Sequence, residues 1–335
     1  MSCISSKVPD ELVEYIKTGS NFIIAGHVEP DGDCVGSQLA LRSALLRMGK
    51  EAVVCASGPF KRTELRNCIE QFVTIPIDET KLFKSQGAVK AIIVDCSGRG
   101  RTGELQDYLE KFPCAIIDHH AAVTHSLSTP EAPVYINADM PSCTMLIFNL
   151  INALGLQLTK EEASMLLFGL CTDTGFFRHL TEENAVVFEA VAKMIHCGAS
   201  PKETFNIMNG GKSLNSRILI GHILSRTESH FDGKLLISSE TLEENDSFGY
   251  ESRDSDSLYQ SLLSVEGIEA AIIIRQESVD NCTVSLRSID KVDVAQIAAS
   301  FGGGGHKKAA GLTMKGEIPF VKQNMLEAFK KVFVK

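Results

Sequence analysis

Short apolar runs alternate with amphipathic stretches along the first 140 residues, and this alternation restricts the fold more than any other feature of the sequence. The runs are almost continuously apolar, as in strands that are covered on both faces, whereas the stretches between several of them have helical spacing. Alternation of this kind predicts a parallel sheet with helices on both faces. The expected strands are residues 22–25, 52–55, 91–94, 115–117 and 134–136.

Helix boundaries are indicated by the residues that flank the amphipathic stretches. Glycine follows three of these stretches, as it often does at the C-terminal end of a helix. Thr159 and Glu162 form the spacing of a capping box before a fourth. The expected helices are residues 35–48, 143–154, 160–170 and 182–197.

After Gly233 the pattern changes to short strands, which predicts a separate α/β domain. The 335 residues are enough for two cores. We expect an N-terminal, mostly parallel sheet with helices on both faces, then a helical connector, then a smaller mixed α/β domain, with bounds 1–190, 191–230 and 231–335. The expected C-terminal elements are strands 235–237, 270–275, 284–286 and 312–314, a turn at 278–281, a closing helix over 319–334 and a mobile polar loop at 246–257.

Composition excludes several classes of protein. No apolar stretch approaches the roughly 20 residues of a membrane-spanning helix, and the N-terminus lacks the apolar core of a signal peptide, so we expect a cytoplasmic protein without membrane contact. Ten scattered cysteines without a C-x-x-C pair indicate a reduced compartment. A net charge of −9 argues against binding long duplex nucleic acid, which needs a basic surface.

Ionisable side chains follow the predicted strands repeatedly. In an open parallel sheet, ligands bind beyond the carboxyl ends of the strands, where these residues lie. The triplet 118–120 directly follows an apolar run, and a triplet of metal-ligand residues at that point needs a chemical reason. The residues at this edge are His27, Asp31, Asp33, Asp95, Asp118, His119 and His120, and Asp173 follows the helix expected over 160–170.

Four of these aspartates would repel one another if they met without a counter-charge, because like charges a few ångströms apart cannot all ionise. Two divalent cations would balance them. Oxygen and imidazole ligands favour Mn²⁺, with Mg²⁺, Co²⁺ and Fe²⁺ as alternatives. Purely structural interpretations remain open, since each aspartate could stabilise a turn or cap a helix. Cys34, Cys96 and Cys171, beside these acids, are interpreted as packing residues.

A second signal is the run of four glycines at 302–305, followed by His306 and two lysines. Consecutive glycines let the backbone approach a ligand and direct N–H groups at an oxyanion. Arg287, in an expected strand, could bind phosphate with two parallel hydrogen bonds, or could be an ordinary surface arginine.

Together these motifs resemble the DHH phosphoesterase superfamily. His27-x-x-Pro-Asp31-x-Asp33, Asp95, Asp118-His119-His120 and Asp173 match its catalytic motifs in order. The glycine-rich segment 302–311 is similar to that of the DHH-associated C-terminal domain. The arrangement is most similar to the oligoribonuclease/pAp phosphatase (nanoRNase) subfamily.

The resemblance implies a role for each residue. His27 and Asp31 would hold one metal ion, Asp33, His119 and Asp173 the other, and Asp95 would bridge both. His120 would contact the scissile phosphate and assist the leaving group, while Asp118 would orient a ligand. The far end of the substrate would bind to Arg287, Gly303, Gly304, Gly305 and His306.

The implied activity is two-metal hydrolysis of dinucleotide-sized RNA or DNA, from an end, or of nucleoside bisphosphates such as 3′-phosphoadenosine 5′-phosphate (pAp). The alternatives are hydrolysis of linear or cyclic dinucleotide messengers such as pApA and c-di-AMP, and RecJ-like single-strand exonuclease activity. A catalytically inactive nucleotide-binding regulator is a further alternative. A homodimer is compatible with the resemblance. Glu29, Cys34 and Met145 depart from the family pattern, where Asn, Ala and an acidic residue are common, and they bear on substrate preference.

Overall fold

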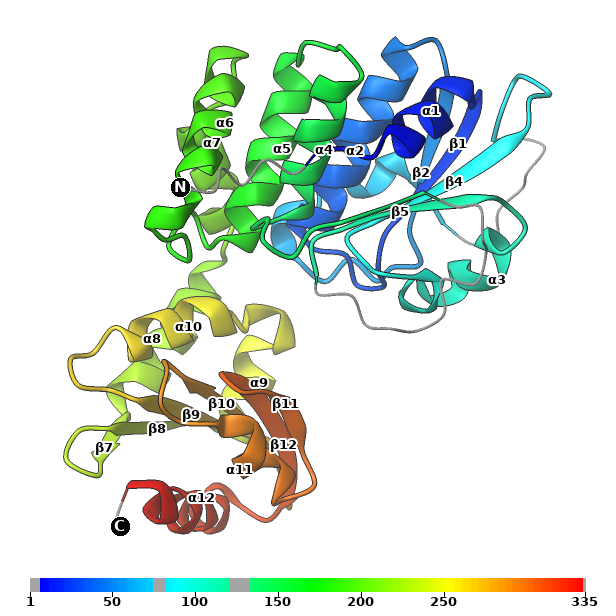
Figure 1. Cartoon of the computed structure of the whole chain (residues 1–335). Helices are drawn as coiled ribbons and strands as arrows, with labels where there is room; N and C mark the ends of the chain where they lie inside the picture. The colour runs from blue at the N-terminus through cyan, green and yellow to red at the C-terminus, as the bar shows by residue number, and fades with distance from the viewer. Residues whose placement is uncertain (1–6, 75–81, 121–132, 334–335) are drawn as a thin grey trace. The chain divides into compact units, whose positions relative to one another are not determined.

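A computed structural model describes residues 7–74, 82–120 and 133–333 (Figure 1). Contacts divide the chain into two units, Met1–Gly211 and Lys212–Lys335. Each unit has its own sheet and its own core. The domain bounds at 190 and 230 stay a prediction.

The first unit contains a sheet in which all neighbouring strands of the described residues pair in parallel. The strand order is β3-β2-β1-β4-β5-β6. This order reverses at the β1/β4 pair, because the chain proceeds outward from β1 in one direction and from β4 in the other. The strands are β1 (Asn21–Ala25), β2 (Glu51–Cys55), β3 (Phe72–Val73), β4 (Val89–Val94), β5 (Cys114–Asp118) and β6 (Val134–Ile136).

Helices cover both faces of this sheet, as expected (Figure 1). Alternate residues of a strand point to opposite faces, so Phe22 and Ile24 of β1 pack in one core and Ile23 and Ala25 in the other. The first core includes residues of α1 (Asp10–Thr18), α2 (Gly32–Arg47), α4 (Cys143–Ala153), α5 (Lys160–Asp173) and α6 (Ala185–His196), and the second includes α3 (Gln106–Leu109).

Glycines allow α2 and α5 to cross closely. A Cβ added to Gly36 would lie 2.6 Å from the carbonyl oxygen of Met165, and one added to Gly169 would lie 3.0 Å from Cα of Asp33. Neither position has room for a larger residue. The contact places the N-terminal end of α2 beside the C-terminal half of α5.

The second unit has a mixed sheet of order β11-β12-β10-β9-β8-β7, in which only β8 and β9 among the described strands pair in parallel. One face packs against α11 (Val294–Ala299) and α12 (Ile318–Phe333), and the other against α8 (Leu214–Ser225) and α10 (Ser255–Leu263) (Figure 1). The strands are β7 (Glu228–His230), β8 (Leu235–Glu240), β9 (Ala270–Ser278), β10 (Asn281–Ser288), β11 (Gly304–His306) and β12 (Ala309–Lys315). The predicted α/β fold class is confirmed.

Two local predictions were wrong. The helix expected over 35–48 begins at Gly32, because Asp31 caps it by accepting hydrogen bonds from the backbone N–H groups of Asp33 and Cys34. The polar segment 246–257 is helical over much of its length, spanning the end of α9 (Leu242–Phe248), a 3₁₀ turn and the start of α10. Its helices are capped by Thr241 and Asp254.

No helix within the described residues is both long and apolar enough to cross a membrane. The cysteines of those residues are all unpaired, and most are buried. Cys143, for example, packs at the start of α4 with its thiol on the carbonyl of Ile117.

Candidate metal centre

The predicted ligands of the first unit meet at the carboxyl ends of β1, β4 and β5. His27 follows β1, Asp95 follows β4, and Asp118 is the last residue of β5. These strands lie side by side at the point where the strand order reverses, which is where open α/β sheets bind ligands. Asp33 and Asp173 reach the same place from α2 and α5.

Backbone carbonyls fix the orientation of two histidine rings. Nδ1 of His27 lies 2.8 Å from the carbonyl oxygen of Val28, and Nδ1 of His119 lies 3.3 Å from that of Met140. When Nδ1–H donates to a carbonyl, Nε2 keeps its lone pair and can bind a metal ion. Both Nε2 atoms face carboxylates at the carboxyl ends of the strands.

Asp95 lies between the two rings. Its Oδ2 is 3.4 Å from Nε2 of His27, and its Oδ1 is 3.4 Å from Nε2 of His119. Asp95 is 2% exposed, and Oδ1 and the His119 Nε2 are buried with no hydrogen-bond partner among the described residues. A buried carboxylate oxygen and a buried imidazole nitrogen without hydrogen bonds are the atoms that a cation would satisfy. The donor set therefore fits a divalent metal ion.

Two acids and one histidine form the other half of the cluster. His119 Nε2 is 3.4 Å from Oδ2 of Asp173 and 3.8 Å from Oδ2 of Asp33. One oxygen or nitrogen from each of these three residues falls within 4.8 Å of the others, which is compatible with a shared metal ion. Oxygen and imidazole donors suit Mn²⁺ and its relatives.

Asp33 is fully buried and is held by the N-terminus of α4. It accepts hydrogen bonds from the backbone N–H of Cys143 at 2.6 Å, and from the backbone and hydroxyl of Thr144 at 2.9 and 2.7 Å. A helix N-terminus favours a negative charge. Even so, burial and the nearby carboxylates of Asp95 and Asp173 raise the pKa of Asp33 well above its usual value.

Burial and neighbouring charges also have opposing effects on the pKa values of Asp173 and His119. Burial raises the pKa of Asp173 to about 6, against the opposing effect of His119 and with a contribution from Asp95. Burial disfavours a charged His119, yet its contacts with Asp95 and Asp33 raise the pKa of that imidazole to about 9. The carboxylates together attract positive charge into this site, which is the environment that a divalent cation requires.

Asp31 differs from the other acids because it also caps α2. Its Oδ1 accepts two backbone hydrogen bonds and lies 3.9 Å from Nε2 of His27. Burial works against its charge, but the contact with His27 and the cap hydrogen bond from Cys34 lower its pKa to about 2. Asp31 is thus ionised and close to His27.

Asp118 holds His120 and is itself held by Ser97. One oxygen of Asp118 lies 2.7 Å from Nδ1 of His120 and accepts its backbone N–H, while the other accepts the hydroxyl of Ser97. The contact with Asp118 raises the pKa of His120. His120 is half exposed, so its Nε2 remains available for a ligand. Ser97 was not among the predicted site residues, because a lone serine after a strand carries no specific signal.

Several non-glycine residues beside the cluster have positive φ angles, which strain the backbone. Asp95 has a φ of 59°, Glu29 a φ of 55°, and Phe176 and Phe177, after Asp173, have φ of 56° and 71°. Non-glycine residues rarely adopt this conformation, and such strain concentrates at functional sites. The 3₁₀ helix that follows Asp95 has Gly98 as its N-cap, so Asp95 does not cap it, which was its structural alternative.

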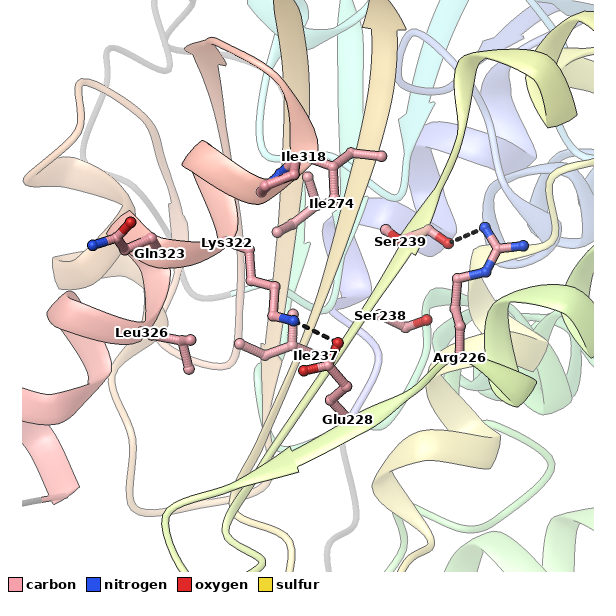
Figure 2. A pocket seen from close by; sticks show the side chains of 11 residues that line it. Arg226, Glu228, Ile237, Ser238, Ser239, Ile274, Ile318, Lys322, Gln323 and Leu326 are labelled. Carbon is pink, nitrogen blue, oxygen red and sulfur yellow. Dashed lines mark hydrogen bonds and ion pairs between the residues drawn. The ribbon is translucent and has the colours of Figure 1, made fainter.

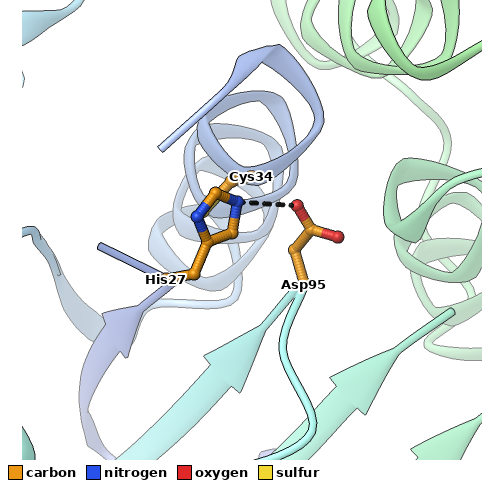
Figure 3. A group of neighbouring side chains, drawn as sticks. All are labelled: His27, Cys34 and Asp95. Carbon is orange, nitrogen blue, oxygen red and sulfur yellow. Dashed lines mark ion pairs between the residues drawn. The ribbon is translucent and has the colours of Figure 1, made fainter. Parts of the chain in front are cut away.

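Cys34, which was predicted to be a packing residue, lies within the cluster. Cys34, His27 and Asp95 each offer one donor atom, and these atoms lie within 4.8 Å of one another (Figure 3). Sequence could have indicated this, because Cys34 comes one residue after Asp33 in the segment that follows β1.

The predicted substrate-binding residues lie in the second unit, on neighbouring strands. Arg287 of β10 pairs with Ala309 of β12, and Ala309 pairs with His306 of β11. Paired residues point to the same face, so Arg287 and His306 flank a small alanine, about two strand spacings or 10 Å apart. The guanidinium of Arg287 also stacks on the ring of Tyr259, 5.0 Å from its centre.

Not all the glycines of this segment are needed for ligand approach. A Cβ on Gly303 would lie 2.3 Å from the carbonyl of Gly311, and one on Gly305 would lie 2.5 Å from that of Ala309, so both are required for the β11–β12 pairing. Gly304 has open space around it. Of the three, it is the glycine for which the pairing gives no steric reason.

A pocket of about 290 Å³ lies elsewhere in the second unit, beside β8 and the start of α12 (Figure 2). Its charged side chains are paired, Lys322 with Glu228 and Arg226 with Glu244. It contains none of the predicted site residues.

Two of the departures from the family pattern have local explanations. Glu29 forms an ion pair with Lys61, so its charge has a partner of its own. Met145 is buried in the first turn of α4, next to Thr144, which binds Asp33.

Comparison with family models follows the same division of the chain. The DHH family N-terminal domain matches residues 21–170, and the DHHA1 domain matches residues 232–335. The chain contains a DHH family N-terminal domain and a DHHA1 domain. Every predicted metal ligand except Asp173 falls within the first match.

Curated relatives resemble almost the whole chain. It is 29% identical over 323 residues to the bifunctional oligoribonuclease and PAP phosphatase NrnA of Thermus thermophilus, covering 92% of this chain and 89% of that protein. It is 23% identical over 319 residues to the cyclic-di-AMP phosphodiesterase GdpP of Bacillus subtilis, covering 91% of this chain and 46% of that protein.

Among solved structures, an exopolyphosphatase-related protein from Bacteroides fragilis matches with a TM-score of 0.81 at 23% identity, over 97% of both chains. That likeness supports the fold.

Proposed function

We propose that this protein is a two-metal phosphoesterase that hydrolyses dinucleotide-sized oligonucleotides, nucleoside bisphosphates such as pAp, or both. The observation that carries the proposal is Asp95, whose two oxygens each lie 3.4 Å from a different imidazole. A carboxylate in that position can bridge two ions. The oligoribonuclease and PAP phosphatase relative supports this substrate class.

The ligands divide into two sets around Asp95. His27 and Asp31 would hold one ion, while Asp33, His119 and Asp173 would hold the other. When bound, two divalent ions, Mn²⁺ in our proposal, supply Lewis acidity toward a phosphoryl oxygen and a nucleophilic water at neutral pH. The carbonyls of Val28 and Met140 keep both imidazoles correctly oriented for this.

His120 would contact the scissile phosphate and donate a proton to the leaving oxygen. Asp118 supports this role because it binds Nδ1 of His120 at 2.7 Å and so directs Nε2 outward. Arg287 and His306, in one row across β10, β12 and β11, together with the backbone at Gly304, would bind the far phosphate or base.

A second candidate is hydrolysis of linear or cyclic dinucleotide messengers, which the cyclic-di-AMP phosphodiesterase relative favours. Both functions use the same metal centre and differ in how the substrate is held. RecJ-like activity on long single strands would instead need an extended basic groove.

One substrate panel tests the proposal. The purified protein with Mn²⁺ is offered pAp, a dinucleotide, c-di-AMP, pyrophosphate and a long single-stranded RNA. We expect mononucleotide from the dinucleotide or phosphate from pAp, and loss of activity by about 10³-fold or more in Asp95→Ala. Full activity in that variant would refute the two-metal centre. Turnover of c-di-AMP alone would select the second candidate.

A further inference from the structure

The thiol of Cys34 lies among the donor atoms of the first predicted metal position. Figure 3 shows Cys34 on α2 together with His27 and Asp95. Cys34 is fully buried, and its sulfur packs against the backbone before His27, since a Cβ added to Gly26 would be 2.0 Å from it. The sulfur is therefore confined beside the imidazole.

The carboxylate of the group is buried. Asp95 is 2% exposed, and its Oδ1, which faces Nε2 of His119 at 3.4 Å, has no hydrogen-bond donor in the described part of the chain. A buried carboxylate without donors is costly unless a cation satisfies it. Its other oxygen faces Nε2 of His27 at 3.4 Å.

We propose that Cys34 is a sulfur ligand to a thiophilic divalent ion, such as Co²⁺, Zn²⁺ or Cd²⁺, bound by His27 and Asp95. The inference rests on the proposed function only in placing a metal ion at these residues. Thiolate, imidazole and carboxylate together form a donor set that such ions prefer over Mn²⁺ or Mg²⁺.

Coordination requires the thiol proton to leave. The S–H bond breaks, the metal–sulfur bond forms, and the proton passes to solvent, with no change of oxidation state. The thiol is fully buried, which favours its neutral form, so the metal ion must displace that proton. The exchange also gives up one contact, 3.7 Å long, from the thiol to Oε1 of Gln38. Thiols are weak donors, so this loss is small.

The two metal positions would then differ in chemistry. The position of Asp33, His119 and Asp173 offers oxygen and nitrogen donors. The position of His27 and Asp95 would add sulfur. We therefore expect thiophilic ions to occupy the His27 position first, and protein that holds two different metals to carry the softer ion there.

Cobalt spectroscopy tests this directly, without substrate. Co²⁺ added to the metal-free wild-type protein is expected to give a near-ultraviolet sulfur-to-cobalt charge-transfer band, which Cys34→Ser should lack. Serine keeps a hydroxyl that can donate to Gln38, so the buried amide stays satisfied. The matched control is Cys96→Ser, which changes another buried cysteine beside Asp95 and should keep the band.

Affinity provides a second measurement. Mutation of a residue that only orients a metal ligand lowers metal affinity by roughly 10-fold or more. Cys34→Ser removes a direct ligand, so it should weaken Cd²⁺ binding by more than that, while the affinity for Mn²⁺ should stay within about 2-fold of the wild-type value. Wild-type protein without the band, or a band that survives Cys34→Ser, overturns the proposal. If Cys34→Ser does not fold, cadmium NMR of the wild-type protein decides, since a thiolate-bound cadmium resonates far from an oxygen-bound one.

The outcome is independent of catalysis. A band that depends on Cys34 in a protein that turns over none of the panel substrates would support the sulfur ligand and refute the proposed function.

Discussion

Replacing Asp173 by asparagine should stabilise the metal-free protein while removing most of the stabilisation that metal ions provide. Burial moves the pKa of this carboxyl from 3.8 to about 6, so its charged form is unfavourable in the folded state. At about 1.4 kcal/mol per tenfold change in proton affinity, the penalty is at most roughly 3 kcal/mol at neutral pH. The side chain is 30% exposed, and solvent screening reduces the expected gain to about 1–2 kcal/mol.

The pH dependence has a definite sign. The folded state binds the Asp173 proton more tightly than the unfolded state, so this group favours folding below pH 3.8, and that contribution is lost as pH rises to about 6. The stability difference between Asp173→Asn and wild type should therefore grow between these pH values and stay constant above them.

The assay is urea unfolding in EDTA at several pH values, followed by thermal unfolding with and without Mn²⁺. Asp107→Asn, at an exposed position, is the control and should change stability by less than about 0.5 kcal/mol. A metal-free Asp173→Asn protein that is less stable than wild type at pH 7 would refute the electrostatic reasoning. If Mn²⁺ raises the unfolding temperature of Asp173→Asn as much as that of wild type, Asp173 is not a metal ligand.

Other variants probe the packing and the site. Gly169→Ala should cost about 1–3 kcal/mol in urea unfolding and weaken Mn²⁺ binding, because its methyl group would press on Thr144 of α4 and on Asp33 of α2. Gly221→Ala, on α8 with open space around it, should instead gain about 0.5–1 kcal/mol, and equal effects would contradict the steric argument. Glu240 is buried and forms ion pairs with two arginines, Arg253 and Arg275. Glu240→Gln removes the negative charge of this group and should lower the free energy of unfolding by about 3–5 kcal/mol; a loss below about 1 kcal/mol would contradict the argument that the ion pairs stabilise the fold. Asp118→Asn should reduce kcat without weakening Mn²⁺ binding, since it acts through His120, and calorimetry showing weaker binding would place it among the ligands.

The positions of the predicted ligands could largely be derived from the sequence because several of these residues follow apolar strands. Where such a strand ends, the chain must emerge at the carboxyl edge, so the placement of His27 and Asp95 followed from pattern alone. Which nitrogen of His27 faces the site was not predictable, because the carbonyl of Val28 decides it and a carbonyl carries no residue-specific signal.

Helix boundaries were predicted less well, and for identifiable reasons. Hydrophobic periodicity begins at Val35, whereas α2 begins where Asp31 caps it, three residues earlier. The segment 246–257 has few apolar residues, so it was interpreted as a loop, although the capping box of Thr241 and Glu244 was visible in the sequence.

The close crossing of α2 and α5 would make the proposed metal centre selective for the radius of its ion. Asp33 and Asp173 belong to different helices, and Gly36 and Gly169 set how near those helices come. A larger ion must push apart two helices packed in one core, and a smaller ion must draw them together against full van der Waals contact. Preference for one cation radius would then be carried by two residues that never touch the metal.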